Sequence, residues 1–405
     1  GGGPRYVLES VGMTLIAAFA YIMSHKEGGM AVAIPVLGAL ALGAQRLLPA
    51  IQQAYASFSS IKGAETSLND VLSLLDQPLP EYINQPLPTP IPFEREIKLT
   101  NLSFRYTKDT SLVLKNINLS IVKGERIGFM GVTGSGKSTL LDIIMGLLPP
   151  TDGKLTIDQK PLNSQNRRAW QAHIAHVPQN IYLSDSSIEE NIAFGTPIEK
   201  IDHQQVKKAA KEAQIGESIA QWKDGYKTLI GERGIRLSGG QRQRIGIARA
   251  LAVEPKLIIC DEPVSALDVS IQAQVVNLLE DLQKKFSLTY LFISHDLSMI
   301  RHIADRVAVM YLGKIVELAN SESLYSTPLH PYTQALLSAV PSNDPKQEKK
   351  RERVILVGDV PSPANPPSGC NFNTRCPRAE KRCSIDPPEW RQISPGHQVA
   401  CHLVQ

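Results

Sequence analysis

The chain has 405 residues, which is enough for two or three domains. Hydrophobic residues make up 42% and charged residues 20%, as in a globular protein with a large core. The formal net charge of +4, from 43 basic and 39 acidic residues, is too small to indicate a nucleic-acid partner.

Two apolar stretches open the chain, at Tyr6–Met23 and at Met30–Leu48. Each is about long enough to cross a hydrocarbon core of ~30 Å as a helix. Joined by the short turn Ser24–Gly29, they predict a transmembrane hairpin. A pair of buried helices in a soluble protein is one alternative. A signal peptide cleaved after Ala18–Ala20 is another, although a second apolar stretch follows it.

The rest of the chain falls into three further segments. Residues 49–76 keep a helical pattern but turn polar, so residues 1–76 are expected to form a partial membrane domain of two helices with a cytoplasmic extension. Proline recurs through residues 77–93, which predicts a stiff linker. Strand and helix patterns alternate over residues 94–320, which predicts an α/β domain. Residues 321–405 form a loop-rich extension that carries a cluster of cysteines.

The strongest motif is Gly131–Ser138, which reads GVTGSGKS and fits the phosphate loop GxxxxGK[ST]. A strand pattern at Arg126–Met130 precedes it and a helical pattern follows it. Glycine backbone N–H groups and the helix N-terminus can cradle phosphates, Lys137 can reach the β- and γ-phosphates, and the Ser138 hydroxyl can bind Mg²⁺. The expected nucleotide-binding residues of this segment are Gly131, Thr133, Gly134, Ser135, Gly136, Lys137, Ser138 and Thr139.

A second motif joins a buried strand to two carboxylates. Four apolar residues from Leu257 precede Asp261 and Glu262, and side chains at the carboxyl end of such a strand lie where ligands bind in parallel sheets. Asp261 can hold Mg²⁺ through water, and Glu262 can act as general base on the attacking water. Alone, this pattern is as often structural as functional.

The segment Leu237–Gln241 reads LSGGQ, and with it the chain resembles the ATP-binding cassette (ABC) family of transporter ATPases. The resemblance implies a P-loop NTPase fold with a helical subdomain at about residues 180–240. It also implies a second phosphate cradle that binds ATP held by the opposite subunit, and therefore a dimer with two shared sites. The residues assigned to this cradle are Ser238, Gly239, Gly240 and Gln241.

Further positions match the family in order along the chain. Gln179 resembles the glutamine that contacts Mg²⁺ and couples to the membrane domain, and His295 resembles the switch histidine on the γ-phosphate. Asp268 belongs to the loop that crosses the dimer interface. Tyr106 stands where the family stacks an aromatic ring on adenine. Taken singly, each residue could be structural; as an ordered set they indicate an ATP hydrolase that uses Mg²⁺.

The resemblance divides between two subfamilies. Residues 1–236, with the hairpin and the exporter-like Gly231–Gly234, resemble exporter half-transporters, among them flippases of lipid-linked oligosaccharides. Residues 251–405 resemble the ATP-binding subunits of oligopeptide/dipeptide importers, on the segments Asp261–Ser270, Ser294–Leu297 and His330–Leu337. Peptide import is the preferred interpretation. Export or lipid flipping is an alternative, and so is a chimeric chain with an uncoupled ATPase.

The importer interpretation carries expectations about partners and location. The chain should pair with a second ABC ATPase subunit and with transmembrane permease subunits, and it should not bind nucleic acid. It should lie at the inner membrane with the ATPase domain on the cytoplasmic face. A soluble ATPase of DNA repair or translation is disfavoured because the chain lacks a long coiled coil or a second cassette.

Four cysteines follow the spacing C-x5-C-x6-C-x17-C near the end of the chain. Four thiolates suit an iron–sulfur cluster or zinc, although this is not a zinc-ribbon spacing. Some importers of the family resembled hold a [4Fe–4S] cluster here. Four free thiols in a disordered tail are the alternative. The candidate ligands are Cys370, Cys376, Cys383 and Cys401.

Overall fold

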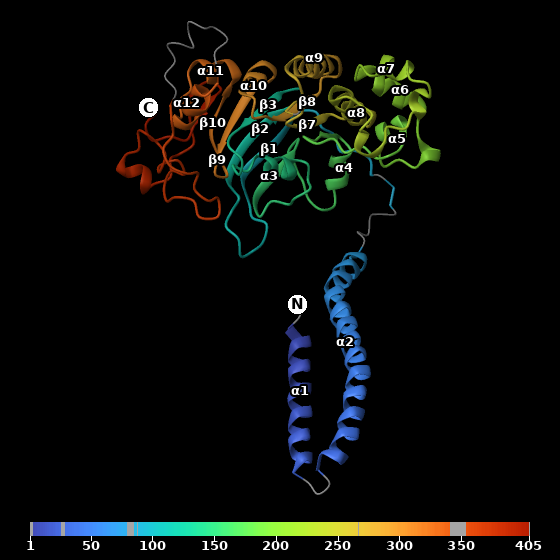
Figure 1. The fold of residues 1–405 in the computed structure, drawn as a ribbon. Coiled ribbons are helices and arrows are strands. Elements are labelled where there is room, and N and C mark those ends of the chain that lie inside the picture. The colour runs from blue at the N-terminus through green and yellow to red at the C-terminus, as the bar shows by residue number, and fades with distance from the viewer. Residues whose placement is uncertain are drawn as a thin grey trace. The chain divides into compact units, whose positions relative to one another are not determined.

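The computed structural model describes residues 3–25, 29–78, 85–86, 88–265, 267–340 and 354–404 (Figure 1). The chain divides into two compact units, Gly1–Pro86 and Leu87–Gln405. Residues 79–84 and 87 of the predicted proline-rich linker lie outside the described residues, as does Ala266, two residues before Asp268. Each unit is considered by itself.

The first unit consists of two helices in contact, α1 (Gly3–Ser24) and α2 (Gly29–Leu75). α2 continues through Pro35 and Pro49, so the second apolar stretch and the polar stretch after it form one helix. The part of α2 from Ile34 to Leu75 is long and apolar enough to cross a membrane, and none of its apolar window is buried.

Of the two membrane spans predicted from the sequence, one corresponds to a helix that is long and apolar enough to cross a membrane. Among the described residues, the apolar part of α1 runs from Ser10 to Met23 and is shorter than a full span. The side chains of residues 3–9 lie outside the described set. The helical hairpin itself is present, and one of its two helices has the length and composition of a membrane span.

The second unit contains a small antiparallel sheet whose strands run in the order β2-β1-β4-β5. Buried and exposed residues alternate along β1, the pattern of a strand with one face on the core. Its buried side chains join the core that also contains helix α3 (Lys137–Ile144). The strands are β1 (Glu96–Phe104), β2 (Leu114–Val122), β4 (Asp152–Ile157) and β5 (Lys160–Pro161).

The main sheet has eight strands in the order β11-β12-β10-β9-β3-β8-β7-β6. The run from β9 to β6 is parallel, whereas β10, β12 and β11 pair antiparallel. The strands are β3 (Arg126–Met130), β6 (Ile174–Val177), β7 (Leu257–Asp261), β8 (Thr289–Ile293), β9 (Arg306–Tyr311), β10 (Lys314–Asn320), β11 (Arg391–Ser394) and β12 (His397–Val399).

Both faces of the parallel strands are covered, which explains their continuous apolar sequences. Ile259 of β7 and Leu291 of β8 join the core with α3, and their neighbours Ile258 and Phe292 join the core on the opposite face. Figure 1 shows α9 and α10 on the side of the sheet away from α3. The helices are α3 (Lys137–Ile144), α4 (Arg167–Gln171), α9 (Val269–Phe286) and α10 (Leu297–Ile303). The expected α/β fold is confirmed.

Short helices fill the interval between β6 and β7, where the helical subdomain is expected. The N-cap Ser187 of α5 forms a capping box with Glu190, and α5 and α6 both contact the longer helix α8. The helices are α5 (Ile188–Ile192), α6 (His203–Glu212), α7 (Gly216–Ala220) and α8 (Gly239–Ala252), with 3₁₀ turns at Ile198–Lys200, Gly225–Lys227 and Glu232–Gly234.

The C-terminal extension is more regular than the predicted loop-rich tail. It contains α11 (Ser321–Ser326), α12 (Pro331–Ser338), a 3₁₀ turn at Lys381–Ser384 and the hairpin β11–β12. Because β12 pairs with β10, the main sheet continues across residue 320 into the extension. The described part of this segment is therefore folded onto the α/β domain.

Candidate nucleotide-binding site

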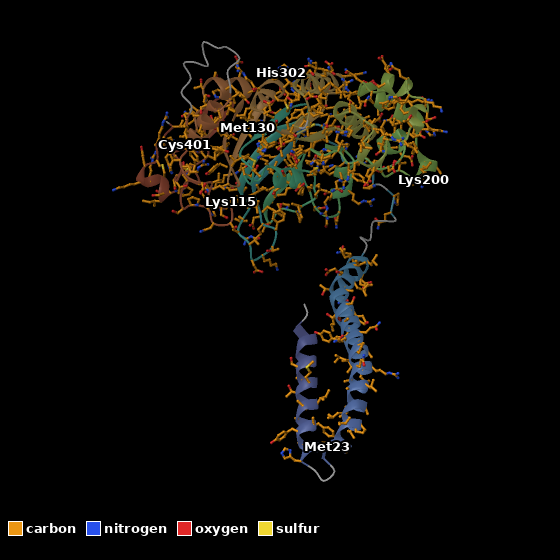
Figure 2. All side chains as sticks on the ribbon, viewed as in Figure 1. Met23, Lys115, Met130, Lys200, His302 and Cys401 are labelled. Atoms are coloured by element: carbon orange, nitrogen blue, oxygen red, sulfur yellow. The ribbon has the colours of Figure 1, made fainter. Side chains whose placement is uncertain are left out.

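The phosphate loop connects β3, which ends at Met130 (labelled in Figure 2), to the start of α3. Gly131 has φ +147°, and a Cβ atom there would lie 2.3 Å from the carbonyl oxygen of Met310. Gly136 caps α3 in the left-handed conformation with φ 99°. The loop therefore needs glycine at both positions, and the N-terminus of α3 opens into it.

Lys137 is buried at the base of this loop. Its Nζ donates to the carbonyl oxygens of Gly131 (2.7 Å) and Val132 (3.1 Å). Burial lowers the pKa of the Lys137 ammonium, while the carboxylates of Glu262 and Asp261 act in the opposite direction. In the structure, the predicted phosphate-binding Lys137 is therefore close enough to Asp261 and Glu262 to interact with both carboxylates electrostatically.

Tyr106 lies beside the start of the same helix. Its hydroxyl is 3.1 Å from Thr139 Oγ1, and its ring stands edge-on to Phe104 with the centroids 5.0 Å apart. The residue is 60% exposed, so it is not a core side chain. A ring held in this way at the phosphate loop can stack on a nucleotide base.

Glu262 is the centre of the carboxylate cluster. Gln179 Nε2 donates to Glu262 Oε2 at 2.8 Å, and His295 Nε2 lies 3.1 Å from Glu262 Oε1. Burial raises the pKa of the neighbouring Asp261 carboxyl. Two side chains from distant parts of the sequence, Gln179 and His295, therefore meet at the carboxylate of Glu262.

Strand order explains this meeting. β3, β8, β7 and β6 are adjacent and parallel, so their carboxyl ends lie along the same edge of the sheet. The phosphate loop follows β3, His295 follows β8, Glu262 follows β7 and Gln179 follows β6. The exposed hydroxyl of Ser138 and the half-buried Asp261 complete the set of predicted Mg²⁺ ligands on this edge.

The predicted second cradle forms the start of α8. Ser238 caps this helix: its Oγ accepts the Gln241 N–H at 3.2 Å, and Gln241 Oε1 accepts the Ser238 N–H at 2.9 Å. Cβ atoms at Gly239 and Gly240 would lie 3.1 Å from Leu267 and 2.9 Å from Ile271, so glycine allows this turn to lie close to the start of α9. Asp268 is the N-cap residue of α9.

The contacts of the second cradle are local. The hydrogen bonds that the structure records for Ser238 and Gln241 stay within the start of α8, and none reaches the phosphate loop in the described part of the chain. The chain thus presents two separate helix N-termini suited to phosphate.

One contact at the site was not predicted from the sequence. The hydroxyl of Tyr332, on α12, accepts the backbone N–H of Val132 in the phosphate loop at 2.9 Å. The two residues are 200 positions apart. The sequence analysis placed Tyr332 in the importer-like segment but had no signal linking it to the phosphates, because nothing in the local pattern specifies a partner in a distant loop.

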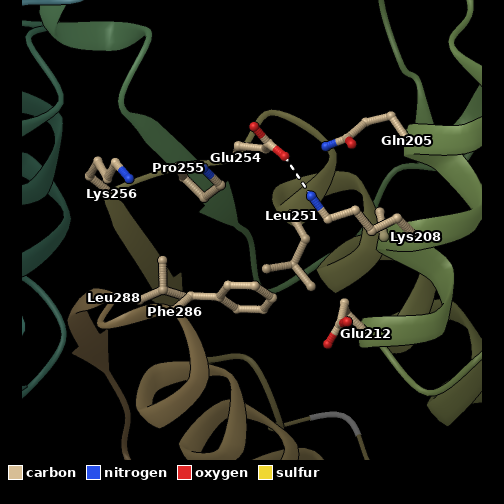
Figure 3. A pocket seen from close by; sticks show the side chains of 10 residues that line it. Gln205, Lys208, Glu212, Leu251, Glu254, Pro255, Lys256, Phe286 and Leu288 are labelled. Carbon is tan, nitrogen blue, oxygen red and sulfur yellow. Dashed lines mark hydrogen bonds and ion pairs between the residues drawn. The ribbon is translucent and has the colours of Figure 1, made fainter.

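A cavity of about 190 Å³ lies elsewhere, between α6 and the ends of α8 and α9 (Figure 3). Lys208 Nζ pairs with Glu254 Oε1 across it at 2.8 Å, and Leu251 and Phe286 supply apolar surface. None of the predicted nucleotide-binding residues lines this cavity. The candidate site is therefore the open edge of the sheet.

The four C-terminal cysteines gather in one segment and form no disulfide. The Cys370 N–H donates to the Cys383 carbonyl at 2.8 Å. Burial raises the pKa of the Cys370 thiol, and the thiols of Cys383, Cys401 and Cys376 raise it further. Within the described ranges, no group of three or more His, Cys, Asp or Glu side chains is close enough to hold a metal ion.

A phosphate loop and a carboxylate cluster on the carboxyl edge of a parallel sheet define a P-loop nucleotide hydrolase. The comparisons with known proteins specify the class further. Residues 114–265 match the family described as ABC transporter, and residues 316–383 match the oligopeptide/dipeptide transporter C-terminal region.

Curated relatives align with most of their length. The oligopeptide transport ATP-binding protein AppF of Bacillus subtilis is 47% identical over 71% of this chain and 88% of that protein. A putative peptide import ATP-binding protein of Brucella ovis is 46% identical over 72% and 92%. The oligopeptide transport ATP-binding protein OppF of Haemophilus influenzae is 42% identical over 76% and 96%. This chain belongs to the ABC transporter ATP-binding proteins, a family of ATP hydrolases.

Solved structures share the fold. A bacterial Atm1-family ABC exporter with ATP bound has a TM-score of 0.57, at 24% identity, covering 85% of this chain and 59% of the exporter. The protein cbiO1 of Clostridium perfringens, part of an ABC transporter complex, has a TM-score of 0.51 at 28% identity, covering 58% of this chain and 92% of that protein. The exporter match is evidence for the fold alone.

Proposed function

We propose that this chain hydrolyses ATP to drive the import of oligopeptides. The observation that carries the proposal is that residues 316–383 match the oligopeptide/dipeptide transporter C-terminal region. The matched segment begins in β10, which pairs with β9 of the main sheet. The names of these relatives, which share 42–47% identity with this chain, describe peptide or oligopeptide transport.

In the proposed reaction, the phosphate loop and Lys137 bind the phosphates of ATP, and Tyr106 stacks on the adenine. Glu262 accepts a proton from water as the water oxygen attacks the γ-phosphorus, and the bond to the ADP oxygen breaks. His295 contacts the γ-phosphate. The contacts from Gln179 and His295 to the two oxygens of Glu262 support this assignment, because they orient the carboxylate.

The fit of Mg²⁺ rests on three side chains at the sheet edge: the Ser138 hydroxyl, the Gln179 amide and the Asp261 carboxylate. Oxygen ligands of this kind suit Mg²⁺, which when bound neutralises charge on the phosphates. Gln179 links the Mg²⁺ site to the base, because its amide group donates to Glu262.

The second cradle serves the opposite subunit in this proposal. Two ABC ATPase subunits, identical or related, close head-to-tail so that Ser238, Gly239, Gly240 and Gln241 of one contact ATP on Lys137 of the other. Asp268 lies at the interface. The separation of the two helix N-termini within one chain supports this arrangement, because neither cradle completes the other internally.

The proposed assembly includes permease subunits in the inner membrane, with the ATPase domain on the cytoplasmic face. We assign residues 1–76 to a partial membrane domain, 77–93 to a linker, 94–320 to the nucleotide-binding domain with a helical subdomain at about 180–240, and 321–405 to the importer-type extension. The uncovered apolar length of α2 supports membrane contact for the first segment.

We also propose that the four C-terminal thiols bind a soft metal centre, either zinc or a [4Fe–4S] cluster. Their gathering in one segment without disulfides supports this, although they would have to draw closer than they lie here. Thiolates are the protein ligands that both centres prefer. Metal analysis of anaerobically purified protein, with Cys383→Ser as the matched variant, tests it; an equal absence of zinc and iron in both contradicts it.

Transport direction is tested by reconstitution. The full chain is incorporated into proteoliposomes with its co-purifying permease subunits and ATPase partner, and the uptake of a labelled oligopeptide is measured with and without ATP. ATP-dependent uptake that disappears with Glu262→Gln in this chain is the expected result. Peptide uptake that does not respond to ATP or to this substitution contradicts the proposal.

Two other outcomes have defined meanings. Movement of a lipid-linked oligosaccharide or another substrate out of the cytoplasmic side favours the exporter alternative. Steady ATP hydrolysis that neither peptide nor permease changes indicates an uncoupled ATPase, as a chimeric chain predicts.

A further inference from the structure

We propose that Tyr332 is a positioning residue of the ATP site. Its hydroxyl holds the first peptide group of the phosphate loop, and its ring transmits to that loop the arrangement of residues 370–401, the cysteine-bearing segment. The inference rests on ATP binding by this chain and is independent of the direction of transport.

The contact involves a single peptide group. The Val132 N–H donates to Tyr332 Oη at 2.9 Å, and the carbonyl of the same peptide, on Gly131, accepts from Lys137 Nζ at 2.7 Å. Gly131 lies against the Met310 carbonyl, where even a Cβ atom would be 2.3 Å away. Tyr332 therefore holds the N–H of this peptide, Lys137 holds its carbonyl, and the Met310 carbonyl on β9 packs against Gly131.

The contact from Tyr332 matters because the Lys137 ammonium has two partners, the Gly131 carbonyl and the phosphates of ATP. The ammonium that contacts Gly131 is the group that reaches the phosphates of ATP. When its contacts shift toward phosphate, Tyr332 remains to orient the Gly131–Val132 peptide. Burial raises the pKa of the Tyr332 hydroxyl to about 12, so the group is neutral at physiological pH.

The position of Tyr332 is itself set by buried contacts at the start of α12. The His330 side chain accepts the Tyr332 N–H at 3.0 Å, and Pro331 occupies the first turn, where a proline costs no hydrogen bond. The His330 N–H donates to the fully buried Glu317 on β10 at 2.9 Å, and the other Glu317 oxygen lies 2.7 Å from His397 on β12.

The His330–Pro331–Tyr332 sequence thus has a structural meaning. His330 caps the helix, Pro331 begins it, and Tyr332 extends from it to the phosphate loop. Because Glu317 connects α12 to both β10 and β12, the hydroxyl is held by the extension as a whole rather than by one helix.

The cysteine-bearing segment contacts the Tyr332 ring directly. Phe372, fully buried, lies with its ring centroid 5.4 Å from Tyr332 and 5.2 Å from Tyr311. Cys370 is two residues before Phe372, and Asn371 between them donates to the Leu312 carbonyl at 3.0 Å. A rearrangement around Cys370 would move Phe372 against the ring that holds the loop, because close-packed side chains transmit such shifts.

The primary experiment uses Tyr332→Phe in the full chain, which keeps the ring and removes only the hydroxyl. ATP affinity is measured by calorimetry in a Glu262→Gln background, and KM and kcat are measured with Glu262 intact. We expect Kd and KM for ATP to rise about five- to tenfold, the effect of one lost hydrogen bond, and kcat to stay within about twofold.

Tyr290→Phe is the matched control. Tyr290 is fully buried in β8, and its hydroxyl has no hydrogen-bond partner in the described part of the protein, so its removal should leave ATP affinity unchanged. Thermal unfolding of both variants reports on folding. A wild-type ATP affinity in a folded Tyr332→Phe protein overturns the proposal, and so does an equal loss in both variants.

A double-mutant cycle tests the link to the cysteine-bearing segment. Phe372→Leu is combined with Tyr332→Phe, with Phe372→Met in its place if the leucine variant does not fold. We expect Phe372→Leu to weaken ATP binding and the double variant to differ from the product of the two single effects by more than about twofold. Independent effects, or no effect of Phe372→Leu, overturn the coupling through Phe372.

Discussion

His295 Nε2 and Glu262 Oε1 lie 3.1 Å apart although they follow different strands of the parallel sheet. The other oxygen of the carboxylate accepts from Gln179 at 2.8 Å. Glu262 is therefore oriented from both sides by groups that follow the strands neighbouring its own. His295 is half-exposed, whereas the carboxylate of Glu262 is mostly buried. Because the two groups are in contact, a substitution at His295 would change the environment of the proposed general base.

The first prediction concerns Glu262. Replacing it with Gln keeps the shape and the contact with His295 but removes the proton acceptor, so kcat for ATP hydrolysis should fall about 10²- to 10⁴-fold. ATP affinity should stay close to the wild-type value. Phosphate release and nucleotide retention measure the two effects. Glu254→Gln, a change at an exposed carboxylate near the cavity, serves as control and should leave turnover unchanged; equal turnover in all three proteins would remove Glu262 from the mechanism.

The second prediction concerns Lys137. The variant Lys137→Met retains an unbranched side chain for the buried position but loses the ammonium that contacts the phosphate loop. Since charge-assisted hydrogen bonds to phosphate are lost, ATP affinity should drop at least about tenfold. Calorimetric titration with Mg·ATP measures the change. Lys208→Met removes an exposed ammonium that lines the separate cavity and should bind ATP normally; weakening of the same size in both variants would contradict the assignment.

The third prediction concerns Gly131. The methyl group of Gly131→Ala would lie 2.3 Å from the Met310 carbonyl oxygen, at a φ of +147° that side chains rarely adopt. The loop must therefore shift, and we expect ATP binding to be lost together with several degrees of thermal stability. Gly216→Ala is the control, because its Cβ would meet its nearest neighbour at an ordinary 3.5 Å. Unaltered ATP binding by the Gly131 variant would contradict the geometry of the loop.

The fourth prediction concerns pH and His330. Burial lowers the pKa of His330 to about 3, whereas an unfolded histidine titrates near 6.5, so the folded protein keeps this ring neutral. The unfolded state alone takes up the proton between these values. The contribution to stability is thus fully present above about pH 6.5 and declines as the pH falls, by about 2 kcal/mol between pH 7 and pH 5.

His330→Asn isolates this effect. Asparagine can still cap α12, but it does not titrate, so the stability difference between wild type and variant should shift by about 2 kcal/mol in favour of the variant between pH 7 and pH 5. Urea unfolding followed by tryptophan fluorescence at both pH values measures the shift. Every other titrating group is common to the two proteins. Parallel pH profiles would show that His330 is not buried in its neutral form.

Local signals sufficed for the elements that build the sheet and the phosphate loop. The strand at Arg126–Met130 has the bounds expected from its sequence, because strands buried on both faces need continuous hydrophobic residues. The loop between Gly131 and Lys137 was recognisable because its backbone requires glycine at particular positions. The strands β11 and β12 were missed because each is too short to show a periodic pattern.

The sequence by itself determined which chemical groups the site contains: the loop lysine, the paired carboxylates, and the glutamine and histidine that match the family. Only the tertiary structure decided how they meet. The strand order β3-β8-β7-β6 brings Gln179 and His295 to the two oxygens of Glu262, and the folding of the extension onto β10 brings Tyr332 to Val132. Hydrogen bonds between distant segments depend on how sheets and helices pack, and that packing is a property of the whole chain rather than of any local pattern.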